Sequence, residues 1–170
     1  RYIGDWSSDV CSSDLNSLQD LKEGKKPSND YSLNLINPIN FQLNKFFYKT
    51  IGKNHNWMDR LSWSEENWIN YVSSQNVRTY VFKLKEDLVG FFELIFHPEK
   101  NETEIAYFGI LEEYQNKKLG SYLLSEAIKL SFQNHTKRVW VHTCSLDHKN
   151  ALKNYISRGM KIYKTETLNI

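Results

Sequence analysis

Three neighbouring segments with the character of β-strands place the strongest constraint on how this chain folds. Residues 78–85, 88–97 and 102–110 carry strand-like apolar patterns, and only two short turns separate them, at residues 86–87 and 99–101. Strands joined by turns this short pair with one another in the antiparallel direction. The sequence therefore predicts a β-meander in the middle of the chain.

After the meander the chain alternates between helix and strand. Apolar residues repeat at helical spacing through residues 116–133, whereas residues 138–144 are β-branched and aromatic, which predicts a strand buried on both faces. Asp147 is expected to cap a short helix, with Gly159 as its left-handed end. The alternating pattern of residues 161–168 predicts a final strand.

Before the meander we expect one strand and two helices. Residues 31–36 alternate weakly like a strand, and a proline opens a predicted helix over residues 38–49. A capping-box pattern at Ser62 or Ser64 starts the second helix. The chain has 170 residues, of which 40% are hydrophobic, which is enough for one domain core and too few for two. We therefore expect residues 31–170 to form a single α/β domain.

The part of the chain before residue 31 is expected to lie outside this domain. Residues 1–15 show neither helical nor strand periodicity, lack the pattern of a signal peptide, and resemble the in-frame translation of a sequencing adapter. A natural flexible tail is the alternative. Residues 16–30 are polar and include a glycine and a proline, which is typical of a linker. We predict a non-native tail, then a polar linker, then the domain.

Charge and cysteine content argue against several classes of function. The net charge is +2 and the basic residues are scattered, so no nucleic-acid partner is expected. No apolar run approaches the roughly 18 residues that a membrane helix needs, so no membrane partner is expected either. Cys11 and Cys144 cannot build a disulfide framework or a metal cluster. We expect no metal, and the reducing cytoplasm as the default compartment.

The junction between residues 108–110 and the helix that follows carries the clearest chemical signal. The first N–H groups of a helix lack an internal acceptor, and the helix dipole favours an anion at that end. Gly120 lets a phosphate approach the backbone, and Lys117 and Lys118 add positive charge. These features predict an anion site; an ordinary strand-to-helix turn with solvated lysines is the alternative.

This junction also resembles motif A of the GNAT superfamily of acetyl-CoA-dependent N-acyltransferases, whose signature is Gln/Arg-x-x-Gly-x-Gly/Ala. Gln115 fills the first place of the signature and Gly120 the last, whereas Lys118 stands where the middle glycine is expected. The resemblance implies that Gln115 and the residues after it contact the cofactor.

A second match follows at the family's spacing. The segment before the last predicted strand resembles the family helix Asn-x-x-Ala-x-x-x-Tyr-x-x-x-Gly-Phe, with Ala151, Tyr155 and Gly159 in place. His148 replaces the usual asparagine, and a methionine replaces the usual phenylalanine. Together the two matches extend the resemblance over residues 77–168.

The resemblance implies a GNAT fold, in which a mixed, mostly antiparallel sheet flanked by helices holds acetyl-CoA between strands that splay apart. Backbone groups of Phe108, Gly109 and Ile110 would pair with the pantetheine arm. The pyrophosphate would lie against N–H groups of Asn116, Lys117, Lys118, Leu119, Gly120 and Ser121. The Cβ of Lys118 opposes a left-handed backbone by about 1–2 kcal/mol, and His148 is a candidate for a further CoA contact.

The implied reaction moves an acetyl group from acetyl-CoA to a primary amine by direct attack in a ternary complex. Such a reaction needs a base for the amine and an acid for the departing thiolate. A carboxylate at the place of Glu104 is the base in the histone-acetylating branch of the family, and Glu93 on the preceding strand is its rival. Tyr155 matches the family's tyrosine acid. The alternatives are charged positions on a solvated sheet face and, for Tyr155, a core aromatic.

Other assignments stay open. The chain could be a non-catalytic CoA-binding module, or an enzyme that uses another acyl-CoA or acetylates a protein N-terminus. Cys144 lies near His142 and His148, which would suit a cysteine nucleophile, although transfer in this family is direct. The two histidines would lack a third ligand for a metal. The acceptor is expected to be a small-molecule or peptide amine, and the protein a monomer or homodimer.

Four aromatic residues between the first strand and the meander have two interpretations. Trp57, Trp63, Trp68 and Tyr71 are expected to pack in the core. Because this family places acceptor-binding elements between its first two strands, the resemblance also makes them candidates for the wall of an acceptor pocket.

Overall fold

A seven-stranded sheet forms the centre of the computed structural model, which describes residues 8–144 and 147–168. The strands lie in the order β2-β3-β4-β5-β6-β1-β7. Along the chain they are β1 (Ser8–Leu15), β2 (Tyr31–Leu35), β3 (Val77–Leu84), β4 (Asp87–His97), β5 (Glu102–Ile110), β6 (Arg138–Cys144) and β7 (Lys161–Leu168). Every neighbouring pair is antiparallel except β5 and β6, which are parallel. The expected mixed, mostly antiparallel sheet is confirmed.

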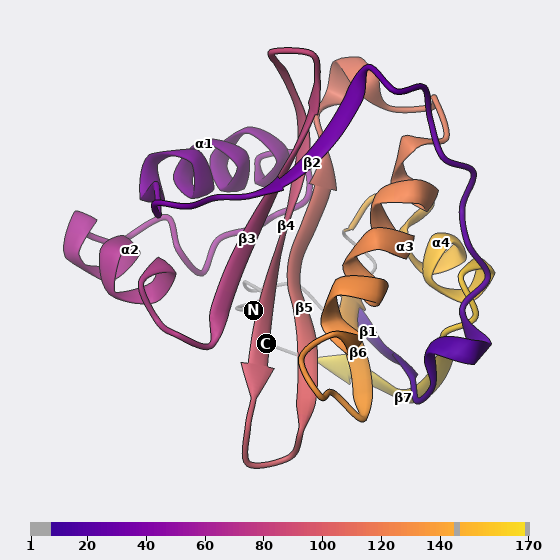
Figure 1. Ribbon diagram of the computed structural model, residues 1–170. Coiled ribbons are helices and arrows are strands. Elements are labelled where there is room, and N and C mark those ends of the chain that lie inside the picture. Colours follow the sequence, from indigo (N-terminus) through magenta and orange to yellow (C-terminus); the bar gives the residue numbers. More distant parts are fainter. Residues whose placement is uncertain (1–7, 145–146, 169–170) are drawn as a thin grey trace.

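Helices cover both faces of this sheet (Figure 1). They are α1 (Phe41–Gly52), α2 (Glu65–Val72), α3 (Leu119–Phe132) and α4 (Ala151–Ser157), with short 3-10 turns η1 (Leu18–Asp20) and η2 (Glu112–Tyr114). Figure 1 shows α1 and α2 on one face, and α3 and α4 on the other. Each face has its own apolar cluster. The α3-side core includes Leu123 and Leu124, and the α1-side core includes Phe47 and Trp68.

The predicted meander is confirmed as β3, β4 and β5. Strands β5, β6 and β7 begin and end at the predicted residues, and β3 and β4 differ from the prediction by one residue at their ends. The two turns of the meander use left-handed residues, Lys85 with φ of 52° and Asn101 with φ of 53°. Residues with positive φ match the twist of the flanking strands, which explains why these short connections form hairpins.

Two of the helix starts differ in detail from the prediction. Helix α1 begins at Phe41 rather than at residue 38, because the side chain of Asn40 caps it by accepting a hydrogen bond from Gln42 N at 3.2 Å. Helix α2 has the predicted capping box at Ser64, although Asn67 completes it in place of a glutamate.

Asp147 does not cap α4, so that prediction is wrong. Its carboxylate instead accepts hydrogen bonds from Thr143 Oγ1 at 2.8 Å and from Cys144 N at 2.9 Å, which ties it to the end of β6. Asn150 takes the N-cap position of α4. The predicted left-handed end at Gly159 is confirmed, with φ of 99°, a conformation that glycine adopts without penalty.

The expectation that β6 is buried on both faces is also wrong. Val139 and Val141 lie in the α3-side core, but His142 is exposed. Helix α3 packs on the face of β6 that carries the two valines, whereas the residues that alternate with them, Arg138, Trp140, His142 and Cys144, are partly or fully exposed. Alternation along a strand then leaves one face open to solvent.

Residues 8–15 correct the expectation that the first fifteen residues lie outside the fold. They form β1, which pairs antiparallel with β6 on one side, from Val10↔Cys144 to Leu15↔Val139, and with β7 on the other. A serine-rich strand can do this because its backbone supplies the hydrogen bonds while Leu15 alone anchors it in the α3-side core. Residues 1–7 lie outside the described residues, and the adapter-like origin of the segment stays a prediction.

The polar segment after β1 also packs on the domain. Gly24 N donates a hydrogen bond to Ser125 Oγ at 2.7 Å, and a Cβ on Gly24 would collide with the backbone of Ser121. Glu23 pairs with Lys129 at 2.6 Å. Residues 16–30 therefore contain contacts to α3 that the description as a linker does not anticipate.

Replacing Leu15 with Ala tests whether β1 belongs to the folded core. The Leu15 side chain is 2% exposed, and deleting a buried leucine side chain lowers the free energy of unfolding by about 2–5 kcal/mol. Leu18→Ala is the matched control, since Leu18 is 45% exposed and should change stability by about 0.5 kcal/mol or less. Equal unfolding midpoints in urea for Leu15→Ala and the wild type would contradict the placement of β1.

Candidate active site

The parallel strands β5 and β6 stay together over a short distance only. Their pairing covers Glu102↔Arg138, Thr103↔Val139 and Glu104↔Trp140, whereas β5 continues to Ile110 and β6 to Cys144. Beyond Glu104 the two strands part, which is the splay expected for this fold.

A cavity of about 570 Å³ lies where the strands part. This volume falls in the range of ligand-binding pockets. Its walls come from the end of β5, the turn into α3, the loop before α4 with α4 itself, and the segment that follows α1. The lining residues are Ile51, His55, Trp57, Phe108, Gly109, Ile110, Tyr114, Gln115, Asn116, Lys118, Leu119, Gly120, Ser121, Asp147, His148, Asn150, Ala151, Lys153, Asn154, Tyr155, Ser157 and Arg158.

The cavity reaches both faces of the sheet. Leu119 and Tyr155 belong to the α3-side core, whereas Ile51 and Trp57 belong to the α1-side core, and all four line the cavity. A ligand can therefore enter from the side of α3 and meet a second molecule on the side of α1.

The predicted cofactor residues come together in this cavity with one exception. The residues that line it are Phe108, Gly109, Ile110, Gln115, Asn116, Lys118, Leu119, Gly120, Ser121 and His148. Lys117 is exposed, and its Nζ lies 5.3 Å from the centre of the Tyr114 ring. Its ammonium makes a cation–π contact with that ring.

The turn into α3 adopts a backbone that its residue types oppose. Asn116 and Lys118 both have φ of 61°, and Lys118 is the N-cap of the helix. The left-handed conformation costs a residue with a Cβ about 1–2 kcal/mol, so the expected obstacle at Lys118 raises the energy of the turn without preventing it. The first N–H groups of α3 then face a cavity lined by Gly120 and Ser121.

Gly120 leaves open a space that the protein itself does not fill. A Cβ at this position would meet only Asn154 Nδ2, at an ordinary contact distance of 3.6 Å. Asn154 Nδ2 also donates a hydrogen bond to Gly120 O at 3.1 Å, which fixes α4 against the first turn of α3. By contrast, a Cβ at Gly109 would meet Ile51 at 2.9 Å. Close packing against Ile51 explains why residue 109 is a glycine. At residue 120, the absence of a side chain leaves space in the cavity.

Arg158 is a cavity residue that the sequence analysis missed. Its Nε is a buried donor that has no hydrogen-bond acceptor among the described residues. Burial lowers the pKa of its guanidinium from the ordinary value. The signal was its position at the end of α4, three residues after Tyr155. Lys118, Lys153 and Arg158 give the lining of the cavity positive charge, which suits an anion.

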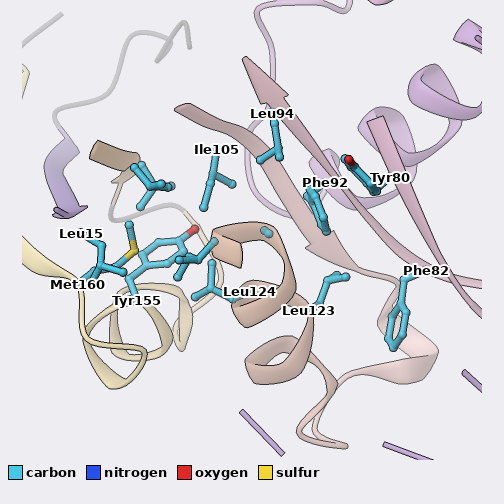
Figure 2. Close-up of a cluster of buried hydrophobic side chains, with 14 of the residues drawn as sticks. Leu15, Tyr80, Phe82, Phe92, Leu94, Ile105, Leu123, Leu124, Tyr155 and Met160 are labelled. Atoms are coloured by element: carbon cyan, nitrogen blue, oxygen red, sulfur yellow. The ribbon is translucent and has the colours of Figure 1, made fainter. Parts of the chain in front are cut away.

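Tyr155 both packs in the core and lines the cavity. It is 6% exposed and packs in the α3-side core, where Figure 2 shows its ring beside Met160 and Leu15. It also lines the cavity. The ring is therefore held in place by packing on one side while the residue borders the ligand space on the other.

Glu93 is enclosed by the protein and does not line the cavity. Its side chain is 0% exposed and accepts hydrogen bonds from Asn44 Nδ2 at 2.8 Å, Arg60 Nη1 at 2.9 Å and Tyr71 Oη at 2.8 Å. Burial alone would lower the pKa of Arg60, but the Glu93 carboxylate raises it above the usual value. Burial, followed by the charge of Glu93, raises the pKa of Tyr71 well above its ordinary value. Glu93 is the anion of a buried network.

Glu104 also lies outside the cavity lining. It is partly exposed and bonds to His97 Nε2 at 3.1 Å. In the sheet it lies opposite Ile95 of β4 and Trp140 of β6, at the point where β5 and β6 are still paired. The structure therefore brings Tyr155 to the cavity without either of the two glutamates.

The four aromatic residues before the meander divide between the two interpretations. Trp57 lines the cavity. The other three surround the guanidinium of Arg60, whose Cζ lies 4.7 Å from the ring centre of Trp63, 5.6 Å from Trp68 and 4.0 Å from Tyr71. Their contacts with a buried cation explain why aromatic side chains are concentrated there.

The cysteine and histidine residues near β6 have separate surroundings. His142 Nδ1 lies 2.6 Å from Ser12 Oγ, and the ring of His148 contacts the ring of His55 at 5.9 Å. Neither Cys11 nor Cys144 is in a disulfide within the part of the chain that the structure describes. Among the described residues there is no group of three or more histidine, cysteine, aspartate or glutamate side chains that could hold a metal ion. Within the same residues, no helix has the length and apolar character needed to cross a bilayer.

The fold and cavity define a class of α/β proteins whose ligand channel runs between two parallel strands that part. The model of the acetyltransferase (GNAT) family matches residues 40–160. Because this match covers most of the chain, the protein belongs to the GNAT acetyltransferase family. No curated protein matches it significantly.

Solved structures share this fold at low sequence identity. A GCN5-related N-acetyltransferase from Sphaerobacter thermophilus is 14% identical with a TM-score of 0.70, over 95% of this chain and 50% of that one. An aminoglycoside acetyltransferase from an uncultured soil metagenomic sample is 15% identical with a TM-score of 0.63, over 77% and 88% of the two chains. A Bacillus subtilis acetyltransferase in complex with CoA is 16% identical with a TM-score of 0.59, over 79% and 78%.

The chain spans only part of several of these proteins. It covers 60%, 56% and 50% of the length of three similar structures, from Staphylococcus epidermidis, Kribbella flavida and Sphaerobacter thermophilus. The matched family is named for acetyl transfer.

Proposed function

We propose that this protein transfers an acetyl group from acetyl-CoA to a primary amine by direct attack within a ternary complex. The observation that carries the proposal is the cavity that crosses the sheet where β5 and β6 part, with Leu119 and Tyr155 on one side and Ile51 and Trp57 on the other. Two substrates can meet there without a covalent intermediate on the protein.

The residues present fit acetyl-CoA on the α3 side. The space above Gly120 and the first N–H groups of α3 suit a pyrophosphate, since helix N-termini favour anions. Lys118 and Arg158 add positive charge to the lining of the cavity. Phe108 and Ile110 lie at the end of β5 beyond the last pair with β6, where an extended pantetheine arm could take the place of the departed strand.

The chemistry assigns a task to Tyr155. When the amine nitrogen attacks the thioester carbon, the carbon–sulfur bond breaks and the sulfur needs a proton. The Tyr155 hydroxyl is a suitable donor, because a phenol remains protonated at neutral pH. The role of Glu104 or Glu93 as the general base stays a prediction. Neither residue lines the cavity, so their positions do not support this role.

A screen of amines should identify the acceptor. Two similar structures are of an aminoglycoside acetyltransferase, one of them in complex with sisomicin. The panel should therefore include sisomicin, a peptide with an internal lysine and a peptide with a free N-terminus. We expect CoA thiol release together with acetylation of at least one of these amines. Binding of acetyl-CoA without thiol release across an extended amine panel would favour the non-catalytic module instead.

Gly120→Val should weaken acetyl-CoA binding about tenfold or more, because the methyl groups would hold the pyrophosphate away from charge-assisted hydrogen bonds worth about 1.5–3 kcal/mol. The fold should tolerate the change, since the nearest atom to a Cβ is 3.6 Å away. Calorimetric titration measures the affinity. Lys117→Ala, outside the cavity lining, is the control. Unchanged affinity in Gly120→Val would contradict the pyrophosphate site.

A further inference from the structure

The α1 side of the cavity carries a group suited to the acceptor amine. An amine attacks only when its nitrogen has a free lone pair, and a base must take the proton that this nitrogen sheds as the new bond forms. Neither Glu93 nor Glu104 lines the cavity, whereas His55 does. A neutral imidazole is the side chain whose ordinary pKa best suits it to accept a proton near neutral pH.

Local hydrogen bonds hold His55 in place. It lies in the turn after α1, where His55 N and Trp57 N both donate to Gly52 O, at 3.0 Å and 3.1 Å. Ile51, the residue before Gly52 in α1, packs against Gly109 of β5. The pantetheine arm is proposed to lie along this part of β5. The turn is therefore fixed beside the β5 wall, on the side of the sheet opposite to α3.

A second histidine faces His55 from the opposite wall. The rings of His55 and His148 meet edge to face, with centres 5.9 Å apart and planes at 66°. His148 comes from the loop before α4, and its Nδ1 accepts a hydrogen bond from Asn150 N at 3.1 Å. The pair thus joins the α1 side of the cavity to the α4 side, where Tyr155 lies.

The other candidate bases of the cavity have different surroundings. Asp147 lies at the end of β6, where its Oδ2 accepts hydrogen bonds from Thr143 and Cys144. His148 lies on the α4 side, where the family resemblance assigns a CoA contact. Among the lining residues that can accept a proton, His55 is the one that comes from the α1 side.

We propose that His55 is the general base for the acceptor amine, an inference that rests on the proposed function. The amine arrives as R–NH₂, having lost one proton to solvent, and its nitrogen lone pair forms the C–N bond to the acetyl carbon. The C–S bond breaks, and its electron pair leaves with sulfur, which takes the Tyr155 proton. His55 takes the surplus proton from nitrogen and returns one to Tyr155 through water. The products are R–NH–CO–CH₃ and CoA–SH.

Affinity labelling tests this placement without the need for turnover. Bromoacetyl-CoA carries an electrophilic carbon at the position of the acetyl methyl group, where an imidazole nitrogen can displace bromide and form a C–N bond. Peptide mass spectrometry of the wild-type protein should find the label on His55, and CoA should protect against it. Label confined to other residues, or no label while calorimetry shows that CoA binds, would overturn the assignment. Absence of CoA binding would contradict the proposed function itself.

Steady-state kinetics of a His55 variant provide a second test of the assignment. With an amine found by the screen, His55→Gln should lower kcat/KM for that amine about 100-fold, with less than a threefold change in the acetyl-CoA dissociation constant. His135→Asn is the matched control, because His135 is exposed, lies outside the cavity, and has φ of 57°, which asparagine tolerates. If Glu104→Gln shows the loss and His55→Gln does not, the base is Glu104 and the proposal fails.

Discussion

Tyr155→Phe is expected to lower kcat about 10- to 1000-fold, toward the low end of the roughly 10²–10⁴-fold that a positioned acid contributes. The departing thiolate would have to leave without a proton from the protein. A CoA thiol resembles the cysteine thiol, whose ordinary pKa is about 8.5, so it is a fair leaving group and some activity should remain. Steady-state rates measured at saturating acetyl-CoA give the effect on kcat.

Other properties of Tyr155→Phe should change little. The ring that packs beside Met160 and Leu15 is retained (Figure 2), and loss of one hydroxyl hydrogen bond costs about 1 kcal/mol. Affinity for acetyl-CoA should change less than threefold. Tyr122→Phe is the control, since Tyr122 packs on the α3-side core and lies outside the cavity lining. Full activity in Tyr155→Phe would show that Tyr155 serves packing alone.

Glu93→Gln is expected to lower the free energy of unfolding by about 3–5 kcal/mol, the usual cost of leaving one partner of a buried ion pair uncompensated. Arg60 is 5% exposed and would keep its charge, while its counter-charge would be gone. The amide that replaces the carboxylate also cannot accept at both positions, so Asn44, Arg60 and Tyr71 would compete for one oxygen. Urea denaturation followed by tryptophan fluorescence measures the change.

The Glu93 variant also separates a structural role from a catalytic one. Glu99→Gln is the matched control, because that side chain is 62% exposed and its substitution should change stability by about 0.5 kcal/mol or less. If Glu93→Gln kept its stability but lost turnover, Glu93 would be the base after all, and its placement in a closed network would be contradicted.

Strands and helices with regular local patterns were predictable from the sequence. Residues of β5 alternate between buried and partly buried along the whole strand, and both β5 and β7 have the predicted bounds. Strand β1 lacked such a signal. Its buried residues Ser12 and Ser13 are small and polar, and its partners lie more than a hundred residues away in the chain. Pairing between distant segments decides such a strand, which no local pattern records.

The candidate site was predictable where one continuous segment builds it. The turn from Gln115 to Ser121 contains its own helix start and its own glycine, so local rules located it. The base was not predictable in this way. A bulge in the pairing of β4 with β5 places Glu93 opposite Tyr107 and Leu94 opposite Ile105, which shifts the register between Glu93 and Glu104. A register shift changes which face of the sheet a strand residue occupies. The position of this bulge is seen in the folded sheet and has no local signal in the sequence.

The dependence of the initial rate on both substrate concentrations tests the ternary complex most directly. Initial rates should be measured over a matrix of acetyl-CoA and amine concentrations, with an amine identified by the screen. The cavity that joins both faces of the sheet predicts intersecting lines in double-reciprocal plots, because both substrates must be bound before the acetyl group moves. Parallel lines, together with an acetylated protein in the absence of amine, would show transfer through a covalent intermediate and contradict direct attack.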